Sequence, residues 1–432
     1  MFTKSQREKI IALINREVVP AIGCTEPIAV ALCVAHACES IACDAEHQPE
    51  KIAVRLSANI LKNAMGVGIP GTGMTGLPIA IALGALAGRS EYGLEVLKDA
   101  DQSAVEQGKQ MIDEGRISID LAEGDVDKLY IEVEVTAAAR YAKAIIAGGH
   151  TSLVYLEKDG SVVIDKRSAA SDEAEDDDVE LTLRDVYDFS MTAPLDEIEF
   201  IREARRLNKA AAESAFSSDY GHSLGRTLRG DKEKAIIGDT IFSRIISYTA
   251  AACDARMGGA MVPVMSNSGS GNQGITATLP VVVYAEECGA SQEQLTRALM
   301  LSHLTVIYIK QSLGRLSALC GCVVAAAGSS CGITYLMGGG YDEVAMAVKN
   351  MIANLTGMIC DGAKPSCALK LASGVSTAVL SAMLAMEHRC VSKLEGIIDE
   401  DVDRSIRNLT TIGRDGMNET DAYILSIMTG KC

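Results

Sequence analysis

The sequence predicts an α+β fold in which a helix-rich domain is joined to a smaller lobe with antiparallel strands. From residue 181 onward, apolar residues recur at helical spacing almost throughout. Short runs with the alternating pattern of strands are confined to residues 51–164. The acidic run at residues 172–178 separates these parts, and a run of like charges is usually a solvated linker. We therefore place a domain boundary at residue 180.

The composition argues against several classes of partner. Asp and Glu number 57 against 40 Lys and Arg, and the net charge is -17. Nucleic acids and anionic membranes both require basic patches, so neither is an expected partner. The N-terminus lacks the apolar region of a signal peptide, and glycines 338–340 interrupt the longest uncharged run, residues 316–341. We expect a cytoplasmic protein without a membrane-spanning helix.

The cysteines indicate free thiols or metal ligands. There are 13 of them, an odd number, in a large chain without a secretion signal. A disulfide framework is therefore not expected. Most of these cysteines should be packing residues, because a free cysteine behaves as a small buried hydrophobe.

Residues 1–44 are expected to be helical and to pack with the C-terminal domain. Helical spacing over residues 5–19 is followed by a turn and an alanine-rich helix, with Thr25 as N-cap and Pro27 in the first turn. Cys24 thus precedes a helix N-terminus, where the dipole and free amides stabilise a thiolate. Position alone leaves two interpretations open, a reactive thiol and a buried turn residue.

Residues 45–180 are predicted to form an α/β lobe. Alternation over residues 51–57 predicts a first strand, and residues 103–114 have helical spacing. Asp159-Gly160 is a hairpin signal between the last two strands. Further strands are expected at residues 117–121, 129–136, 143–146, 152–156 and 162–164.

Two glycine-rich loops of this lobe are candidate binding elements. The loop at residues 69–78 formally matches a dinucleotide fingerprint, but no clear strand precedes it, so we reject a nicotinamide site. Two interpretations stay open: its amides surround a small carboxylate with Lys62 as charge partner, or it is a plain tight turn. The second loop is Gly148-Gly-His-Thr151. Its His150 has two interpretations: it acts as an acid/base or substrate contact, or it is an incidental loop residue.

Residues 181–432 are predicted to be a helical domain that carries the chemistry. Serine, glycine and asparagine alternate over residues 266–274, between two apolar stretches. This pattern suits a polar turn around a small anion, either a phosphate or an amino-acid carboxylate. The alternative is a turn that packs closely against a helix. No lysine stands in a context that marks a Schiff base to pyridoxal phosphate.

The cysteines between residues 316 and 370 occur where apolar helices meet turns. Cys320 and Cys322 are two apart on a predicted helix, about 200° around its axis, so we expect Cys322 to point away from any site that Cys320 faces. Cys331 is expected to be a packing residue.

The pair Cys360 and Cys367 is seven residues apart, too far on one helix for a small cluster. Gly362 and Pro365 break that helix, so we expect Cys360 to end one helix and Cys367 to begin the next. Three thiolates without a nearby histidine favour zinc or an iron–sulfur centre, and the CxxC spacing of a zinc finger is absent.

The chain resembles the L-cysteine desulfidases, relatives of the iron–sulfur L-serine dehydratases, over nearly its full length. The matching segments are Gly23-Cys-Thr-Glu-Pro27, Lys62-Asn63 with Pro70-Gly-Thr-Gly73, Gly148-Gly-His-Thr151, Ser266-Asn-Ser-Gly-Ser-Gly-Asn-Gln-Gly274, Leu316-Ser-Ala-Leu-Cys320 and Gly357-Met-Ile-Cys-Asp-Gly362 with Ser366-Cys367.

The resemblance implies a 4Fe–4S cluster held by Cys320, Cys360 and Cys367, with Cys24 as the catalytic base. It implies elimination of sulfide from L-cysteine to give pyruvate, ammonia and hydrogen sulfide, without pyridoxal phosphate. Cys432 is a further candidate, as a cap on the open iron. The substrate contacts that we expect are Lys62, Asn63, Gly71, Thr72, His150, Ser268, Ser270, Asn272 and Gln273.

Rival interpretations remain at this point. The same cluster would serve L-serine dehydration, which differs only in the leaving group. A cofactor-free thiol isomerase, an iron–sulfur redox sensor and a metal-free protein with packing cysteines are the others; the sensor is disfavoured because no basic patch is present to bind DNA. The expected partner is a small amino acid, and we expect a homodimer.

Overall fold

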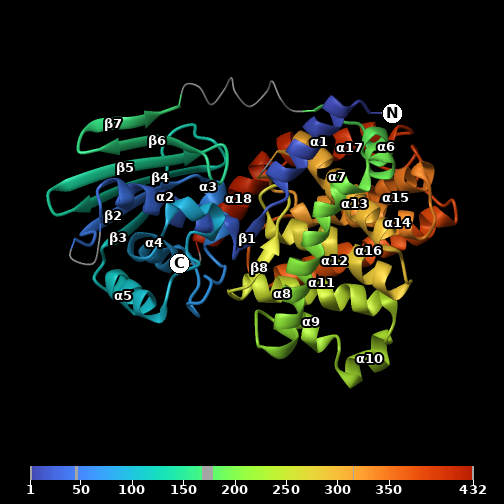
Figure 1. Ribbon diagram of the computed structural model, residues 1–432, viewed down its shortest axis with the longest axis horizontal. Coiled ribbons are helices and arrows are strands. Elements are labelled where there is room, and N and C mark those ends of the chain that lie inside the picture. The colour runs from blue at the N-terminus through green and yellow to red at the C-terminus, as the bar shows by residue number, and fades with distance from the viewer. Residues whose placement is uncertain (1, 44–46, 168–178, 315, 431–432) are drawn as a thin grey trace.

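The computed structural model describes residues 2–43, 47–167, 179–314 and 316–430. The expected acidic linker at residues 172–178 and the candidate Cys432 lie outside the described residues. The described chain has two parts, an α/β lobe and a larger helical part, placed side by side (Figure 1). The α+β fold class is confirmed.

The lobe is built on a six-stranded sheet in the order β3-β2-β4-β5-β6-β7. Strands β2 and β3 pair in parallel and the other pairs are antiparallel, so the sheet is mixed. The connection from β2 to β3 contains helices, which gives the length that a parallel pair requires. The strands are β2 (Lys51–Leu56), β3 (Ile117–Leu121), β4 (Tyr130–Ala137), β5 (Arg140–Ala147), β6 (Leu153–Lys158) and β7 (Ser161–Asp165).

Helix α2 (Thr25–Ser40) forms the core of the lobe, where it packs against β4, β5 and α4. We expected residues 1–44 to pack with the helical domain; α1 (Lys4–Glu17) contributes to that core, whereas α2 contributes to the lobe. The reason is that α2 is apolar almost all round and is buried from Thr25 to Ala35, so it fits only between a sheet and another helix. The other lobe helices are α3 (Ala58–Ala64), α4 (Leu77–Leu86), the 3-10 helix η1 (Ser90–Glu95) and α5 (Gln102–Asp113).

A second, two-stranded sheet joins the two parts near the N-terminus of α2. Strand β1 (Pro20–Ile22) pairs antiparallel with β8 (Pro263–Met265) of the helical part. The sequence does not predict this pair, because three residues are too few to show an alternating pattern. Its consequence is that Cys24 lies beside the loop that begins at Ser266.

Helix α14 (Gly321–Leu336) lies at the centre of the helical part, in contact with α12, α13, α15 and α16. Its small residues allow close approach: a methyl group on Gly328 would lie 2.4 Å from the Ser302 carbonyl oxygen of α13. The other elements before it are α6 (Leu183–Thr192), α7 (Leu195–Ile198), η2 (Glu199–Arg202), α8 (Glu203–Ser217), α9 (Leu224–Thr227), α10 (Asp231–Ile237), α11 (Ile241–Met257), α12 (Gly271–Glu287) and α13 (Gln292–Leu313).

Of the elements after α14, the last one, α18, contacts the lobe. These elements are α15 (Tyr341–Leu355), α16 (Cys367–Met386), α17 (Val402–Thr411), the π-helical turn η3 (Ile412–Gly416) and α18 (Asn418–Thr429). Helix α18 lies between the two parts, against α3 (Figure 1). Among the described helices, α16 alone is long and apolar enough to cross a membrane, and half of that stretch is buried, as in the core helices of globular proteins.

Candidate functional site

One cavity of about 100 Å³ lies between the lobe and the helical part. The start of α2, helix α3, the β5–β6 loop, the end of α11, the 266–274 loop and the two cysteine segments all contribute to its lining. Most of the site residues that were predicted from the sequence line this cavity. They are Cys24, Asn63, His150, Ser268, Ser270, Asn272, Gln273, Cys320, Cys360 and Cys367.

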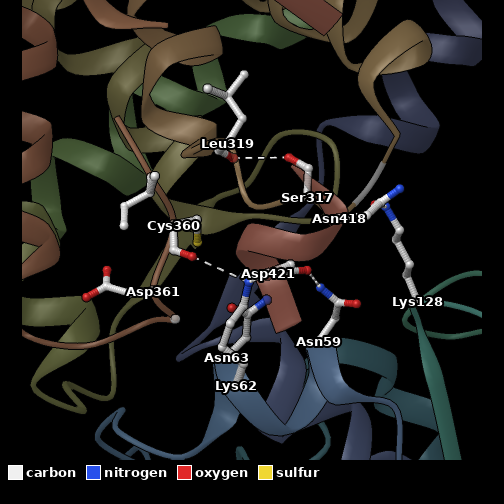
Figure 2. Close-up of polar contacts among 12 residues, drawn as sticks. Asn59, Lys62, Asn63, Lys128, Ser317, Leu319, Cys360, Asp361, Asn418 and Asp421 are labelled. Atoms are coloured by element: carbon white, nitrogen blue, oxygen red, sulfur yellow. Dashed lines mark hydrogen bonds and ion pairs between the residues drawn. The ribbon is translucent and has the colours of Figure 1, made fainter. Parts of the chain in front are cut away.

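Three of the nominated substrate contacts do not line this cavity: Lys62, Gly71 and Thr72. The Lys62 side chain is 1% exposed, forms an ion pair with Asp421, and donates to the Cys360 carbonyl oxygen at 3.4 Å (Figure 2). Its charge is therefore matched within the chain. The Thr72 hydroxyl donates to the Ile69 carbonyl oxygen at 2.8 Å, so the glycine loop closes on itself as a tight turn. The position of these residues does not support the expected substrate contacts.

A short antiparallel bridge sets Cys320 beside Cys360. Leu319 pairs with Ile359, the Cys320 amide donates to the Met358 carbonyl oxygen at 3.0 Å, and the Cys360 amide donates to that of Ala318 at 2.7 Å. We expected Cys360 to end a helix, but α15 stops at Leu355. The expectation fails because the backbone around Cys360 pairs with the segment before α14 instead of continuing the helix.

The third thiol, Cys367, is the first residue of α16, as the sequence suggested. Cys320 is the N-cap of α14, so two helix N-termini, the positive ends of the helix dipoles, lie at the same cavity. Both features favour negative charge on sulfur.

Cys322 lines the same cavity as Cys320, contrary to our expectation that it points away. The 200° argument fails because Cys320 has extended backbone angles (φ -65°, ψ 125°) and lies before the helix rather than on it. The Cys322 sulfur lies 3.2 Å from the Lys370 carbonyl oxygen. It also hydrogen-bonds the Cys320 sulfur, and this contact lowers the pKa of Cys320 to about 7.

The other two thiols hold their protons more tightly. Burial raises the pKa of Cys360 to about 11, with the neighbouring Cys320 charge acting in the same direction. Burial likewise raises the pKa of Cys367. A bound cationic centre would reverse these shifts, because it stabilises each thiolate directly.

The donor chemistry of this cavity fits an iron–sulfur cluster better than a single metal ion. Within the described residues, no group of three or more His, Cys, Asp or Glu side chains is arranged to hold one metal ion. In a 4Fe–4S cluster each thiolate binds a different iron, so the ligands stand farther apart than around one ion. Cys320, Cys360 and Cys367 provide three such thiols on one cavity wall.

Cys24 caps α2 and is 1% exposed. Its thiol donates to the Glu26 carboxylate oxygen Oε2 at 3.0 Å. Burial, and then the charge of Glu26, raise the pKa of Cys24 well above its usual range. The helix dipole alone suggested a thiolate, but desolvation and the neighbouring carboxylate are the larger effects, so Cys24 is a neutral thiol here.

Glu26, which is 8% exposed, is a buried acid for which the sequence predicted no role. Its Oε1 accepts from the Asn63 side-chain amide at 3.2 Å, and the Thr25 hydroxyl lies 3.0 Å from its Oε2. The signal available was an acid in the first turn of a helix, which the dipole stabilises, but many surface helices share it. Burial is what distinguishes Glu26, and burial is not visible in the sequence.

The 266–274 loop is held rigidly by a buried histidine. The Asn267 amide lies 3.1 Å from His303 Nδ1, and His303 Nε2 lies 3.0 Å from the Thr278 hydroxyl. That hydroxyl donates to the Gly274 carbonyl oxygen at 2.7 Å, so the imidazole is neutral with its proton on Nε2. Burial lowers the pKa of His303 to about 3. The loop presents Ser268 and Ser270 to the cavity, and the first turn of α12 presents Asn272 and Gln273.

Arg256, near the end of α11, is another lining residue that was not among the predicted site residues. It is 3% exposed, and its Nε donates to the Gly23 carbonyl oxygen at 3.0 Å. The only sequence signal was its place before a glycine break. A buried arginine and a surface arginine look the same in a sequence.

Comparison with known proteins identifies the class to which this fold and cavity belong. The sequence profile of the serine dehydratase alpha chain matches residues 91–426. The chain is 70% identical over 429 residues to a UPF0597 protein of Bacteroides fragilis, covering 99% of both chains. It is 54% identical over 433 residues to a UPF0597 protein of Porphyromonas gingivalis and 47% identical over 432 residues to one of Oleidesulfovibrio alaskensis, again covering 99% of both chains in each case.

The chain therefore belongs to the serine dehydratase alpha chain family. The resemblance to iron–sulfur serine dehydratases is confirmed at this level, and membership of the family points to a lyase that uses an iron–sulfur cluster. Neither the profile nor the names of these relatives specifies cysteine rather than serine as the substrate.

Proposed function

We propose that the protein is an iron–sulfur-dependent L-cysteine desulfidase, a lyase that converts L-cysteine to pyruvate, ammonia and hydrogen sulfide. The observation that carries the proposal is the convergence of Cys320, Cys360 and Cys367 with the Cys24–Glu26 pair on one cavity. An elimination needs a proton acceptor at the α-carbon and charge stabilisation at the leaving group, and this cavity has residues for both.

The three thiols Cys320, Cys360 and Cys367 would hold a 4Fe–4S cluster. Three protein ligands would leave one iron without a protein ligand, and the cluster would supply a Lewis acid that stabilises negative charge on a departing sulfur. The backbone amides at the starts of α14 and α16 favour negative charge at the thiolates. Lys370, whose ammonium group pairs with Asp361, adds positive charge beside Cys320.

Removal of the α-proton falls to the Cys24–Glu26 pair. Because Cys24 is a neutral thiol, its proton must leave before its sulfur can accept another. Glu26 Oε2, 3.0 Å away, is the acceptor. The electron pair of the Cα–H bond then forms the Cα=Cβ bond, and the Cβ–S pair leaves with the sulfur as sulfide. The aminoacrylate product hydrolyses to pyruvate and ammonia.

L-Serine dehydration is the second candidate function, because the matching family profile is that of a serine dehydratase. The same residues would act, with hydroxide in place of sulfide as the leaving group. Kinetics on the two amino acids, measured side by side on one preparation, separate these functions.

The decisive experiment is anaerobic purification or reconstitution, with iron and sulfide quantified and pyruvate formation measured. The proposal predicts a brown protein with about four irons per chain that forms pyruvate and sulfide in equal amounts from L-cysteine. A reconstituted protein that stays colourless and inactive on both amino acids contradicts the proposal. A brown protein that turns over only L-serine selects the second candidate.

We further propose that the protein is a homodimer that acts on a free amino acid, without nucleic acid or a membrane as partner. Leu380, Met383 and Leu384 of α16 are 50%, 52% and 50% exposed and form an apolar face, and the net charge is -17. Light scattering at micromolar concentration tests the dimer, and a monomer there contradicts it.

A further inference from the structure

The guanidinium of Arg256 is a buried cation without a matching anion. Arg256 is 3% exposed and lines the cavity. Of its five N–H donors, the hydrogen bonds within the described chain use the one on Nε, which donates to the Gly23 carbonyl oxygen at 3.0 Å. No Asp or Glu among the described residues forms an ion pair with it. Burial of an unpaired charge is unfavourable, so this position suits a bound anion.

The backbone around Arg256 fixes where the guanidinium lies. A methyl group on Gly271 would stand 2.3 Å from Arg256 Nε and 2.8 Å from Cζ. The guanidinium therefore packs against the backbone of Gly271 at the start of α12, and its Nε donates to the Gly23 carbonyl oxygen. A planar fork fixed in this way favours a carboxylate, which binds it through two parallel hydrogen bonds.

The same cavity presents buried acceptors that lack donors. Asn63 Oδ1, Asn272 Oδ1 and Gln273 Oε1 are buried, and within the described chain they have no hydrogen-bond partner. The orientation of the Asn63 amide is fixed, because its nitrogen donates to Glu26 Oε1 at 3.2 Å. Buried acceptors left unpaired are unfavourable, so these oxygens call for a ligand with several N–H donors.

A cavity lined by both a cation and several unpaired hydrogen-bond acceptors favours a ligand that carries both charges, a zwitterion. A simple anion such as phosphate would satisfy Arg256 but would leave the amide oxygens unpaired. A simple amine would satisfy the oxygens but leave the guanidinium unpaired. An α-amino acid supplies a carboxylate for one and an ammonium group with three N–H donors for the other.

We infer that Arg256 binds the carboxylate of an α-amino acid, while the side-chain oxygens of Asn63, Asn272 and Gln273 receive its ammonium group. This inference rests on the proposed function and deepens it, since it names the groups that select the substrate class. The side chain of the amino acid is then left to face the cysteine wall formed by Cys320, Cys360 and Cys367. Arg256 is a specificity-determining residue in this arrangement.

The test is calorimetric binding to the full chain, reconstituted anaerobically, with ligands that do not turn over. L-Alanine lacks a β-leaving group, L-alaninamide lacks the carboxylate, and propionate lacks the ammonium group. Wild-type protein should bind L-alanine roughly 10- to 100-fold more tightly than either analogue, since each loses charge-assisted hydrogen bonds. Arg256→Gln should weaken L-alanine binding by a similar factor, and Arg256→Lys should recover part of it.

Gly271→Ala is a matched variant, because it keeps the arginine but displaces the guanidinium, and it should weaken binding as well. Iron content and melting temperature of each variant show whether the loss is local. With L-cysteine as substrate, the loss of binding should appear mainly as a higher KM. A purely structural role of Arg256 would not produce a change confined to KM.

Two results overturn the inference. One is Arg256→Gln protein that binds L-alanine as well as the wild type. The other needs no variant: wild-type protein that binds L-alaninamide and propionate as well as L-alanine, or binds none of them. Failure of the proposed function gives a different result. If the protein binds L-alanine through Arg256 but makes no pyruvate, the inference about Arg256 stands and the desulfidase proposal is wrong.

Discussion

Lys62 of α3 and Asp421 of α18 form an ion pair that joins the lobe to the last helix, across 359 residues of sequence. The two side chains are 1% and 15% exposed. Asn59 donates to the same carboxylate, and Lys62 also donates to the Cys360 carbonyl oxygen (Figure 2). The pair therefore fixes α18 beside a cysteine that lines the cavity.

Asp421→Asn should lower the free energy of unfolding by about 3–5 kcal/mol, because it leaves the Lys62 charge buried and unpaired. Chemical denaturation measures this change. Glu419→Gln, an exposed position in the first turn of the same helix, is the control and should change stability by less than about 1 kcal/mol. Equal effects of the two variants would show that the ion pair does not hold the helix.

Cys320→Ser, Cys360→Ser and Cys367→Ser should each reduce the iron content after reconstitution, since each removes one of three cluster ligands. The visible absorbance and the iron per chain are the measurements. Cys288→Ser, at an exposed position outside the cavity, should keep both. Retention of a full iron content in any of the three variants would remove that residue from the ligand set.

Cys322→Ala should raise the pKa of Cys320 from about 7 toward the usual range of a thiol. The sign follows because the Cys322 hydrogen bond stabilises the Cys320 thiolate, and its loss favours the protonated form. The rate of Cys320 alkylation against pH, measured on cluster-free protein by peptide mass spectrometry, gives this pKa. An unchanged profile would mean that other groups set the pKa of Cys320.

Cys24→Ala should keep the cluster colour and lose turnover by roughly 10²–10⁴-fold, as expected when a proton acceptor is removed. Glu26→Gln should behave alike, because the amide cannot take the Cys24 proton at 3.0 Å. Cys33→Ala, on the same helix but in the core of the lobe, is the matched control. Bleaching of Cys24→Ala protein would instead identify Cys24 as a fourth cluster ligand.

Stability should fall on acidification through His303. Its pKa is about 3 in the folded chain and near 6.5 when unfolded, so below pH 6.5 the unfolded state binds the extra proton. The contribution of His303 is complete above pH 6.5 and is lost as the pH falls toward 3, with a slope of up to about 1.4 kcal/mol per pH unit. Denaturation of His303→Asn protein between pH 4 and pH 7 should show a shallower slope than the wild type, and an equal slope would contradict this assignment.

The sequence predicted those elements in which apolar residues recur at the spacing of a strand or a helix. Strand β2 ends within one residue of the expected range because its alternating side chains record a buried face and a more exposed face. The parallel pairing of β3 with β2 was not predictable, since it depends on how the intervening helices cross the sheet.

The cavity was predictable only in its residue types. Cysteine and amide residues stand out in short motifs, whereas the approach of Cys320 to Cys360 depends on a bridge between Leu319 and Ile359 that has no periodicity. Glu26 and Arg256 were missed for a different reason. What distinguishes these two residues is their burial, because many other glutamates and arginines of this acidic chain lie on the surface.

The position of Asp421 along the chain sets an order for maturation. Every residue that lines the cavity precedes Asp421 in the sequence, so a ribosome has already released the cysteine segments when the partner of Lys62 emerges. Until that moment the lobe and the helical part lack the ion pair that clamps α18 between them. The contact between α18 and the lobe therefore forms only after every residue that lines the cavity has been synthesised.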